Sequence, residues 1–179
     1  MSPRLLIPFF AFAAMTATAA DFEVSSPDLP GHRFAPNLIA NGFGCSGGNQ
    51  SPQIVWRNPP AGTQSFMVTM YDQDAPTGSG YWHWVIANLP PDTTQLPRGA
   101  GSQPDALPAG TLQISNDTGQ PGYLGPCPPV GESHRYLITV IALKTARLDV
   151  PPGVTPATAG FVAHFATLGK ASYTATWSR

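Results

Sequence analysis

Two acidic residues and a histidine lie where strands are expected to end, and together they could form a polar site. Asp72 and Asp74 follow an apolar run at residues 66–71, and His83 belongs to the next β-prone run, residues 81–87. A Gly/Pro-rich turn at residues 75–80 separates the two runs. Neighbouring strands would therefore bring the acids and the imidazole to the same end of a sheet. Carboxylates beside an imidazole are a candidate functional site.

The same three side chains also have a purely structural explanation. Aspartate often accepts a backbone hydrogen bond inside a turn, so Asp72 and Asp74 could cap the turn that follows them. His83 could be a sheet residue whose ring nitrogens are satisfied by the fold. Spacing alone leaves both explanations open.

A second stretch places another histidine in the same way. Residues 119–131 contain four glycines and four prolines, which exclude a helix or a central strand and predict a stiff loop. Residues 135–143 form the best strand pattern in the chain, and His134 lies where this loop becomes the strand. We therefore consider His134 together with His83.

These stretches resemble the phosphatidylethanolamine-binding protein family, also called Raf-kinase-inhibitor-like proteins, and its bacterial branch in particular. The resemblance covers nearly all of the chain after residue 20. One departure is Gln73, which stands where the family usually has a proline between the two acids. The matching motifs are Asp72-Gln73-Asp74-Ala75-Pro76, His83-Trp84-Val85, Gly125-Pro126-Cys127-Pro128-Pro129, His134-Arg135-Tyr136, and Asn49-Gln50-Ser51-Pro52 followed by Trp56.

The resemblance implies both a fold and a site. The fold is mostly β: an antiparallel β-sandwich built on a large central sheet, with short peripheral helices. The site is a pocket for phosphate-type head groups. The residues at the matching positions, which we expect to bind the ligand, are Asp72, Asp74, Pro76, His83, Gly125, His134 and Tyr136.

These residue types suit a small phosphate- or carboxylate-bearing ligand. Histidine and tyrosine supply donors, and backbone N–H groups of a glycine-rich loop can point at an anion. A carboxylate near an imidazole orients the ring and favours its protonated, anion-binding form. We therefore expect a binding or modulatory protein without catalytic activity, cofactor or metal.

Two other classes of function stay open. Two histidines with one or two carboxylates could hold the divalent metal of a hydrolase, although no HExxH-like spacing fixes such ligands. The pocket could instead dock a protein, as in the kinase- and protease-inhibiting relatives. Nucleic acid is not an expected partner, because the net charge is −1 and the chain has no Lys/Arg cluster.

The remaining sequence predicts short strands, irregular loops and one helix. Charged residues are only 11% of the chain, and 39 of its 179 residues are proline or glycine. The helix is expected at residues 156–168, with Thr155 as N-cap, Gly169 at its end and His164 as a surface or packing residue rather than a ligand. Its apolar residues at helical spacing are Phe161, Val162, Phe165 and Leu168. Further strands are expected at residues 22–24, 53–56, 111–115 and 171–177, and loops at 37–51 and 90–109.

The first 20 residues predict a signal peptide. Arg4 is followed by an apolar run at residues 5–14 that is too short to span a bilayer, and small residues at 17–20 suit cleavage. Residues 21–179 are then a single exported domain, periplasmic or secreted, without a transmembrane segment. About 160 residues are enough for one sizeable core.

Two cysteines, Cys45 and Cys127, both lie in glycine-rich loops. An even number of cysteines in an exported chain indicates a disulfide, which here would close a loop of about 83 residues. Two free buried thiols or a weak metal site are the alternatives, although the chain has no CxxC spacing.

Overall fold

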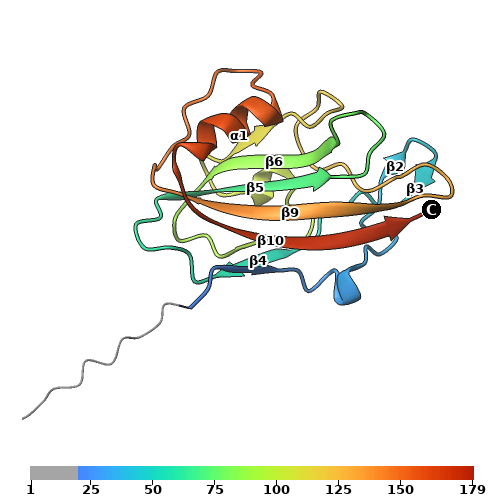
Figure 1. The fold of residues 1–179 in the computed structure, drawn as a ribbon, viewed down its shortest axis with the longest axis horizontal. Coiled ribbons are helices and arrows are strands. Elements are labelled where there is room, and N and C mark those ends of the chain that lie inside the picture. The colour runs from blue at the N-terminus through green and yellow to red at the C-terminus, as the bar shows by residue number, and fades with distance from the viewer. Residues whose placement is uncertain (1–19) are drawn as a thin grey trace, which may run out of the picture.

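The computed structural model describes residues 20–179, so the predicted signal peptide lies outside the described residues apart from Ala20. The protein is mostly β, as predicted, with antiparallel sheets and a single α-helix in this part of the chain (Figure 1). None of the helices in residues 20–179 is long and apolar enough to cross a membrane.

A five-stranded antiparallel sheet organises the molecule, in the order β10-β9-β5-β6-β8. Its long strands come from the β-branched and aromatic runs, where successive side chains alternate between the two faces of the sheet. The strands are β5 (Ser65–Asp72), β6 (Tyr81–Leu89), β8 (Leu112–Ile114), β9 (Ser133–Leu143) and β10 (Thr167–Ser178).

Smaller elements flank this sheet on one side and at one end (Figure 1). A three-stranded sheet has the order β1-β4-β7, and a two-stranded hairpin pairs β2 with β3. Two of these short elements, β7 and the β2–β3 hairpin, lie in segments predicted as loops, since two-residue strands leave no periodic signal. The bounds are β1 (Glu23–Ser25), β2 (Asn41–Gly42), β3 (Cys45–Ser46), β4 (Ile54–Arg57), β7 (Gln95–Leu96), and the 3-10 turns Pro30–His32 and Pro104–Ala106.

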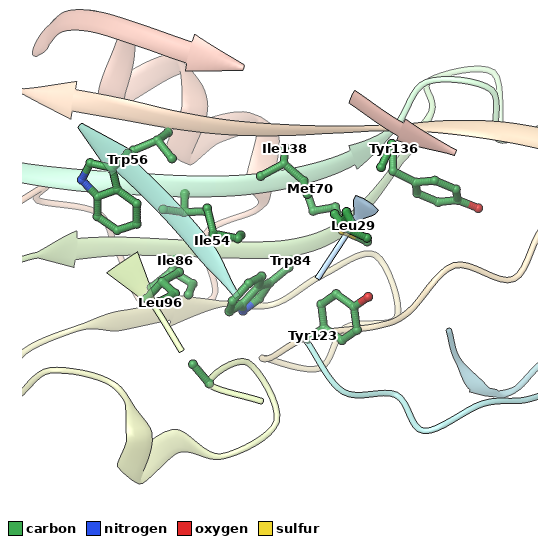
Figure 2. Packing of buried hydrophobic residues seen from close by; sticks show 14 of the residues in the cluster. Leu29, Ile54, Trp56, Met70, Trp84, Ile86, Leu96, Tyr123, Tyr136 and Ile138 are labelled. Carbon is green, nitrogen blue, oxygen red and sulfur yellow. The ribbon is translucent and has the colours of Figure 1, made fainter. Parts of the chain in front are cut away.

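The main core fills the space between the five-stranded and three-stranded sheets. Along β5 the side chains alternate, with Phe66, Val68 and Met70 in this core and Met67 on the opposite face. Figure 2 shows side chains from both sheets meeting in this layer. Its largest fully buried members include Trp56, Trp84, Tyr136, Phe66, Leu29 and Ile54.

A second core lies under helix α1 (Pro156–His164), on the other face of the five-stranded sheet. Thr155 caps the helix as predicted, accepting a hydrogen bond from the Thr158 N–H. The helix residues buried in this core are Ala159 and Ala163, and Val162, predicted on the apolar stripe, packs against it partly buried. Phe161 and Phe165, predicted on the apolar stripe, are 66% and 65% exposed. Alanine faces the sheet because a short side chain lets the helix lie close to it.

The helix is shorter than the prediction of residues 156–168. It ends at His164, and Gly169 lies inside β10 rather than at a helix C-terminus. Thr167 already pairs with Leu143 of β9, so the backbone from this residue on is extended and cannot continue the helix. A Cβ at residue 169 would lie 2.7 Å from Cγ of Pro60. Glycine is therefore needed at this position for close packing.

Candidate functional site

A cavity of about 230 Å³ lies at the end of the five-stranded sheet where β5 ends and where β6 and β9 begin. Antiparallel pairing brings these three strand ends together, as the sequence predicted. Asp72 is the register partner of both Tyr81 and Tyr136. The lining residues are Phe43, Asp72, Ala75, Pro76, Thr77, Tyr81, His83, Leu124, Gly125, Cys127, Pro128, Pro129 and His134.

His134 lies at the floor of the cavity between two carboxylates. Its Nδ1 is 2.7 Å from Oδ2 of Asp72, and its Nε2 is 2.9 Å from Oε2 of Glu132. Ionised carboxylates only accept hydrogen bonds, so both ring nitrogens donate and the ring is an imidazolium. Burial lowers the pKa of His134, but the hydrogen bonds to Glu132 and Asp72 outweigh burial and raise the pKa above its usual value.

His83 is the second imidazole at the floor, and unlike His134 its ring is neutral. Its Nδ1 lies 2.9 Å from the carbonyl oxygen of Leu124, to which it must donate. Burial lowers the pKa of His83 below its usual value, and the Leu124 carbonyl and Asp72 oppose this only in part. Asp72 does favour the protonated form of His83, as expected from the sequence, but burial outweighs this effect and the net pKa is lowered. The neutral ring leaves Nε2 as an acceptor, 3.9 Å from Oδ2 of Asp72.

Asp72 has both of the roles that its sequence position suggested. One carboxylate oxygen, Oδ1, accepts a hydrogen bond of 2.9 Å from the Asp74 N–H, which closes the turn after β5. The other oxygen, Oδ2, holds His134. The side chain is only 4% exposed, so these contacts fix it at the pocket floor.

Two predicted site residues lie outside the cavity lining. Asp74 pairs with Arg135, and this hydrogen-bonded pair holds the pKa of Asp74 at about 2. Tyr136 is fully buried behind the floor, edge-on to His83 with ring centroids 5.2 Å apart. The expectation that the Tyr136 hydroxyl donates into the pocket is therefore not met, because its side chain belongs to the main core.

Gly125 lines the cavity, but its N–H does not point at an anion as expected. It donates instead to Oδ1 of Asn49, at 2.8 Å. A Cβ at residue 125 would lie 2.4 Å from the Ala40 backbone nitrogen. The glycine therefore allows two loops to meet, and Asn49 fastens them together.

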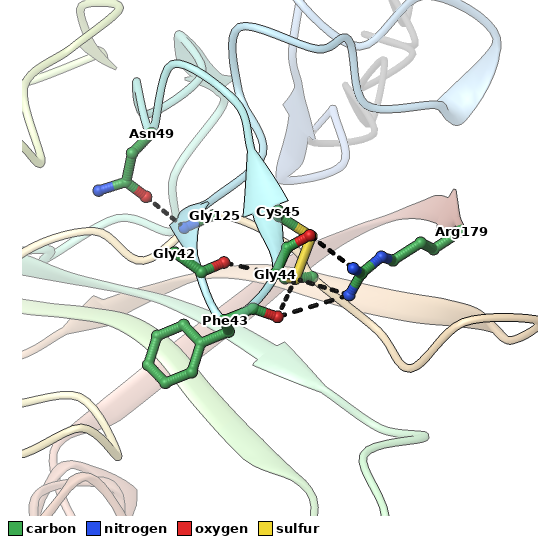
Figure 3. Close-up of a disulfide and its surroundings, with 8 residues drawn as sticks. Gly42, Phe43, Gly44, Cys45, Asn49, Gly125 and Arg179 are labelled. Carbon is green, nitrogen blue, oxygen red and sulfur yellow. Dashed lines mark hydrogen bonds between the residues drawn. A yellow bond between two sulfur atoms is a disulfide. The ribbon is translucent and has the colours of Figure 1, made fainter.

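The rim of the cavity is held by a disulfide between Cys45 and Cys127, whose Cα atoms are 6.0 Å apart (Figure 3). It joins the β2–β3 hairpin to the proline-rich loop after Gly125. Arg179 adds a hydrogen bond of 3.4 Å to the Phe43 carbonyl. Phe43, at the tip of the hairpin, is 71% exposed and lines the cavity mouth.

Sequence reasoning missed Glu132, although a signal was available. Glu132 lies two residues before His134, just ahead of the first residue of β9. In extended chain, residues two apart point to the same side. A carboxylate at this spacing could therefore have been expected to reach the imidazole. Phe43 gave no comparable signal, because its hairpin is held at the pocket by partners distant in sequence, the disulfide to Cys127 and the hydrogen bonds from Arg179.

The charges at the floor limit what the site can do. Asp72 and Glu132 are anionic, His134 is cationic and His83 is neutral, which leaves one net negative charge. An anion therefore needs either a proton on His83 or the departure of Glu132. Within residues 20–179, no group of three or more His, Cys, Asp or Glu residues is arranged to hold a metal ion.

The two histidines are expected to titrate on opposite sides of pH 6.5, the usual value. His83 binds protons more weakly in the folded than in the unfolded protein, so its contribution to stability is lost as the pH falls below about 6.5. His134 binds them more strongly, so its contribution is full below about 6.5 and is lost as the pH rises through its higher folded pKa. NMR titration of the ring protons measures the pKa of each histidine. A higher pKa for His83 than for His134 would contradict these two directions.

Comparison with known proteins agrees with this fold. The family model described as phosphatidylethanolamine-binding protein matches residues 30–178. Escherichia coli YbhB, a UPF0098 protein, is 51% identical over 157 residues, which cover 87% of this chain and 99% of YbhB. A Mycobacterium tuberculosis protein named as a lipoprotein, LppC, is 33% identical in an alignment that covers 90% of this chain and 79% of LppC.

A solved structure gives the same result for the fold. The crystal structure of Escherichia coli YbcL, described as a member of the mammalian PEBP family, superposes with a TM-score of 0.84. The two sequences are 41% identical in this comparison, which covers 89% of this chain and 99% of YbcL.

Proposed function

Because the chain belongs to the phosphatidylethanolamine-binding protein family, and is thus a binding protein, we propose that it is exported and binds a small phosphate- or carboxylate-bearing ligand without catalysing a reaction. The observation that carries this proposal is the floor of the cavity, where two imidazoles flank one buried carboxylate. Phosphate-type head groups have the acceptor oxygens that protonated imidazoles recognise.

In this proposal His83 is the residue that responds to the ligand. Its Nε2 is an acceptor in the free protein, so it must take up a proton before it can donate to an anion. The rings of Tyr81 and Tyr136 pack against it. The charged groups near it are Asp72 and Asp117, which favour the protonated ring, and His134, which disfavours it. Binding should therefore be coupled to uptake of a proton, and affinity should rise as pH falls from about 8 to 6.

The predicted ligand-binding residues then divide by role. His83, His134, Pro76 and Gly125 surround the ligand, and Asp72 orients His134 from behind. Asp74 and Tyr136 act indirectly. Asp74 fixes the strand ends through Arg135, and Tyr136 packs against the rings of His83 and His134.

Export is supported by the disulfide and by a relative. A disulfide persists in an oxidising compartment such as the periplasm or the extracellular space. LppC is named a lipoprotein, and lipoproteins are exported. The predicted signal peptide agrees with a periplasmic or secreted location.

Calorimetric titration with a phosphate monoester at pH 6 and pH 8 tests the binding function. Wild type is expected to bind more tightly at pH 6. His83→Ala should lose at least about tenfold in affinity, since a charge-assisted donor is removed. His164→Ala, a histidine on the exposed side of α1, is the matched control and should bind like wild type. Equal affinity of His83→Ala and wild type would refute the proposed pocket, and binding only with a divalent metal would favour a hydrolase.

Docking of a protein segment at the same mouth is the second candidate. It is favoured by Phe43, an apolar side chain that lines the cavity mouth and is 71% exposed. Exposed apolar residues next to a pocket are typical of interaction sites. In that case Phe43, rather than His83, would dominate the binding energy.

A further inference from the structure

Every imidazole nitrogen at the pocket floor is either engaged or an acceptor. Nδ1 of His83 donates to Leu124, and Nε2 of the same neutral ring carries no proton. Nδ1 of His134 donates to Asp72, and Nε2 of His134 donates to Glu132. An anion that uses His134 must therefore take the place of one of these two carboxylates.

Glu132 is the carboxylate that can leave. Its side chain is 48% exposed, whereas those of His134 and Asp72 are 3% and 4% exposed. Both backbone polar groups of Glu132 are hydrogen-bonded. Its N–H donates to the Pro129 carbonyl, and its carbonyl accepts from the Arg179 N–H. The side chain can therefore swing into solvent while the loop keeps its place.

We propose that Glu132 is a specificity-determining residue that acts as a built-in competitor, its carboxylate occupying the position on Nε2 of His134 that an anionic ligand takes. This inference rests on the proposed binding function. The ligand replaces one oxygen anion by another, so His134 keeps a charged partner throughout. The contact with Glu132 therefore lowers the affinity of every anion that uses Nε2 of His134.

The proposal predicts that removing the competitor strengthens binding. Glu132→Gln keeps the shape but loses the charge, and Glu132→Ala removes the contact altogether. Glu132→Asp keeps the charge but is one methylene shorter, too short to maintain the 2.9 Å contact from the same backbone position. The matched control is Glu23→Gln, because Glu23 pairs with Arg57 on β4, in the other sheet.

Calorimetric titration of the five proteins with inorganic phosphate at pH 6 is the test. Glu132→Ala is expected to gain about tenfold in affinity, which corresponds to one charge-assisted contact. Glu132→Gln and Glu132→Asp should also gain, and Glu23→Gln should match wild type. A gain is diagnostic, because loss of a merely structural contact would loosen the site and weaken binding.

Three outcomes overturn the inference. If wild type binds phosphate and Glu132→Ala binds equally or more weakly, Glu132 is not a competitor and the binding function stands. If Glu132→Gln gains but Glu132→Asp does not, the effect is charge repulsion rather than occupation of Nε2. If neither wild type nor Glu132→Ala binds phosphate, both the competitor role and the proposed function fail.

Discussion

Replacement of Asp72 by alanine is expected to lower the free energy of unfolding by about 3–5 kcal/mol, the usual loss when one member of a buried ion pair is removed. The His134 imidazolium would keep only Glu132, and its Nδ1–H would be buried without an acceptor. The Asp74 N–H in the turn would lose its acceptor as well. One substitution thus breaks two contacts at a site that is almost closed to water.

Asp72→Asn should have a smaller but distinct effect. Both groups that face the carboxylate, the Asp74 N–H and Nδ1 of His134, are donors. An asparagine can offer its oxygen to only one of them, so its NH₂ group faces the other donor. The expected loss is about 1–3 kcal/mol, the penalty for one buried group left unsatisfied.

Urea denaturation of both variants at pH 7 measures these losses. Asp92→Ala, at an exposed turn position, serves as control and should stay within about 0.5 kcal/mol of wild type. Ring-proton NMR should also show a lower pKa for His134 in Asp72→Asn, because a charged partner is gone. A loss below about 1 kcal/mol for Asp72→Ala would contradict the buried pair between Asp72 and His134.

The convergence of the site was predictable because it depends on strand order and side-chain alternation. Phe66, Val68 and Met70 alternate with Met67 in the sequence, and they face the two cores as that pattern requires. A turn between neighbouring strands then leaves His83 beside the end of β5. The residues alone predicted only a mostly β chain, and the antiparallel sandwich followed from the family resemblance that the spaced motifs carry.

Hydrogen-bond partners at the site were not predictable, because they come from loops distant in sequence. Asn49, whose side chain accepts a hydrogen bond from the Gly125 N–H, is 76 residues away from that glycine. Arg135, which forms an ion pair with Asp74 outside the cavity lining, is 61 residues away from it. Sequence spacing shows that donors and acids are present, but only the folded loops decide which of them pair. The protonation states of His83 and His134 follow from that pairing.

Loss of the Cys45–Cys127 disulfide is expected to lower the free energy of unfolding by about 2–5 kcal/mol. The two cysteines are 82 residues apart, so the bond restricts a large part of the unfolded chain. The chain-entropy estimate for such a loop is roughly 4.5 kcal/mol, and native strain usually reduces it. The Cys45→Ala/Cys127→Ala double variant, measured by urea denaturation, gives the value directly.

Reduction of the wild type should reproduce the loss seen in the double variant, and the reductant should leave the double variant unchanged. A change below about 1 kcal/mol in both experiments would show that the surrounding contacts alone hold the rim. Those contacts include the hydrogen bonds from Gly125 N–H to Asn49, from Ala40 N–H to the Pro126 carbonyl, and from Arg179 to the carbonyls of the hairpin turn.

The rim and the floor of the pocket should respond separately to this change. The Phe43 turn would keep its hydrogen bonds from Arg179 but lose its covalent link to the proline-rich loop, so the mouth of the cavity should loosen and phosphate affinity should fall. His83 and His134 lie on β6 and β9, where sheet pairing continues without the disulfide. Their pKa values in the double variant should therefore match those of wild type. If the pKa of either histidine moves toward 6.5, the usual value, the disulfide supports the floor as well as the rim.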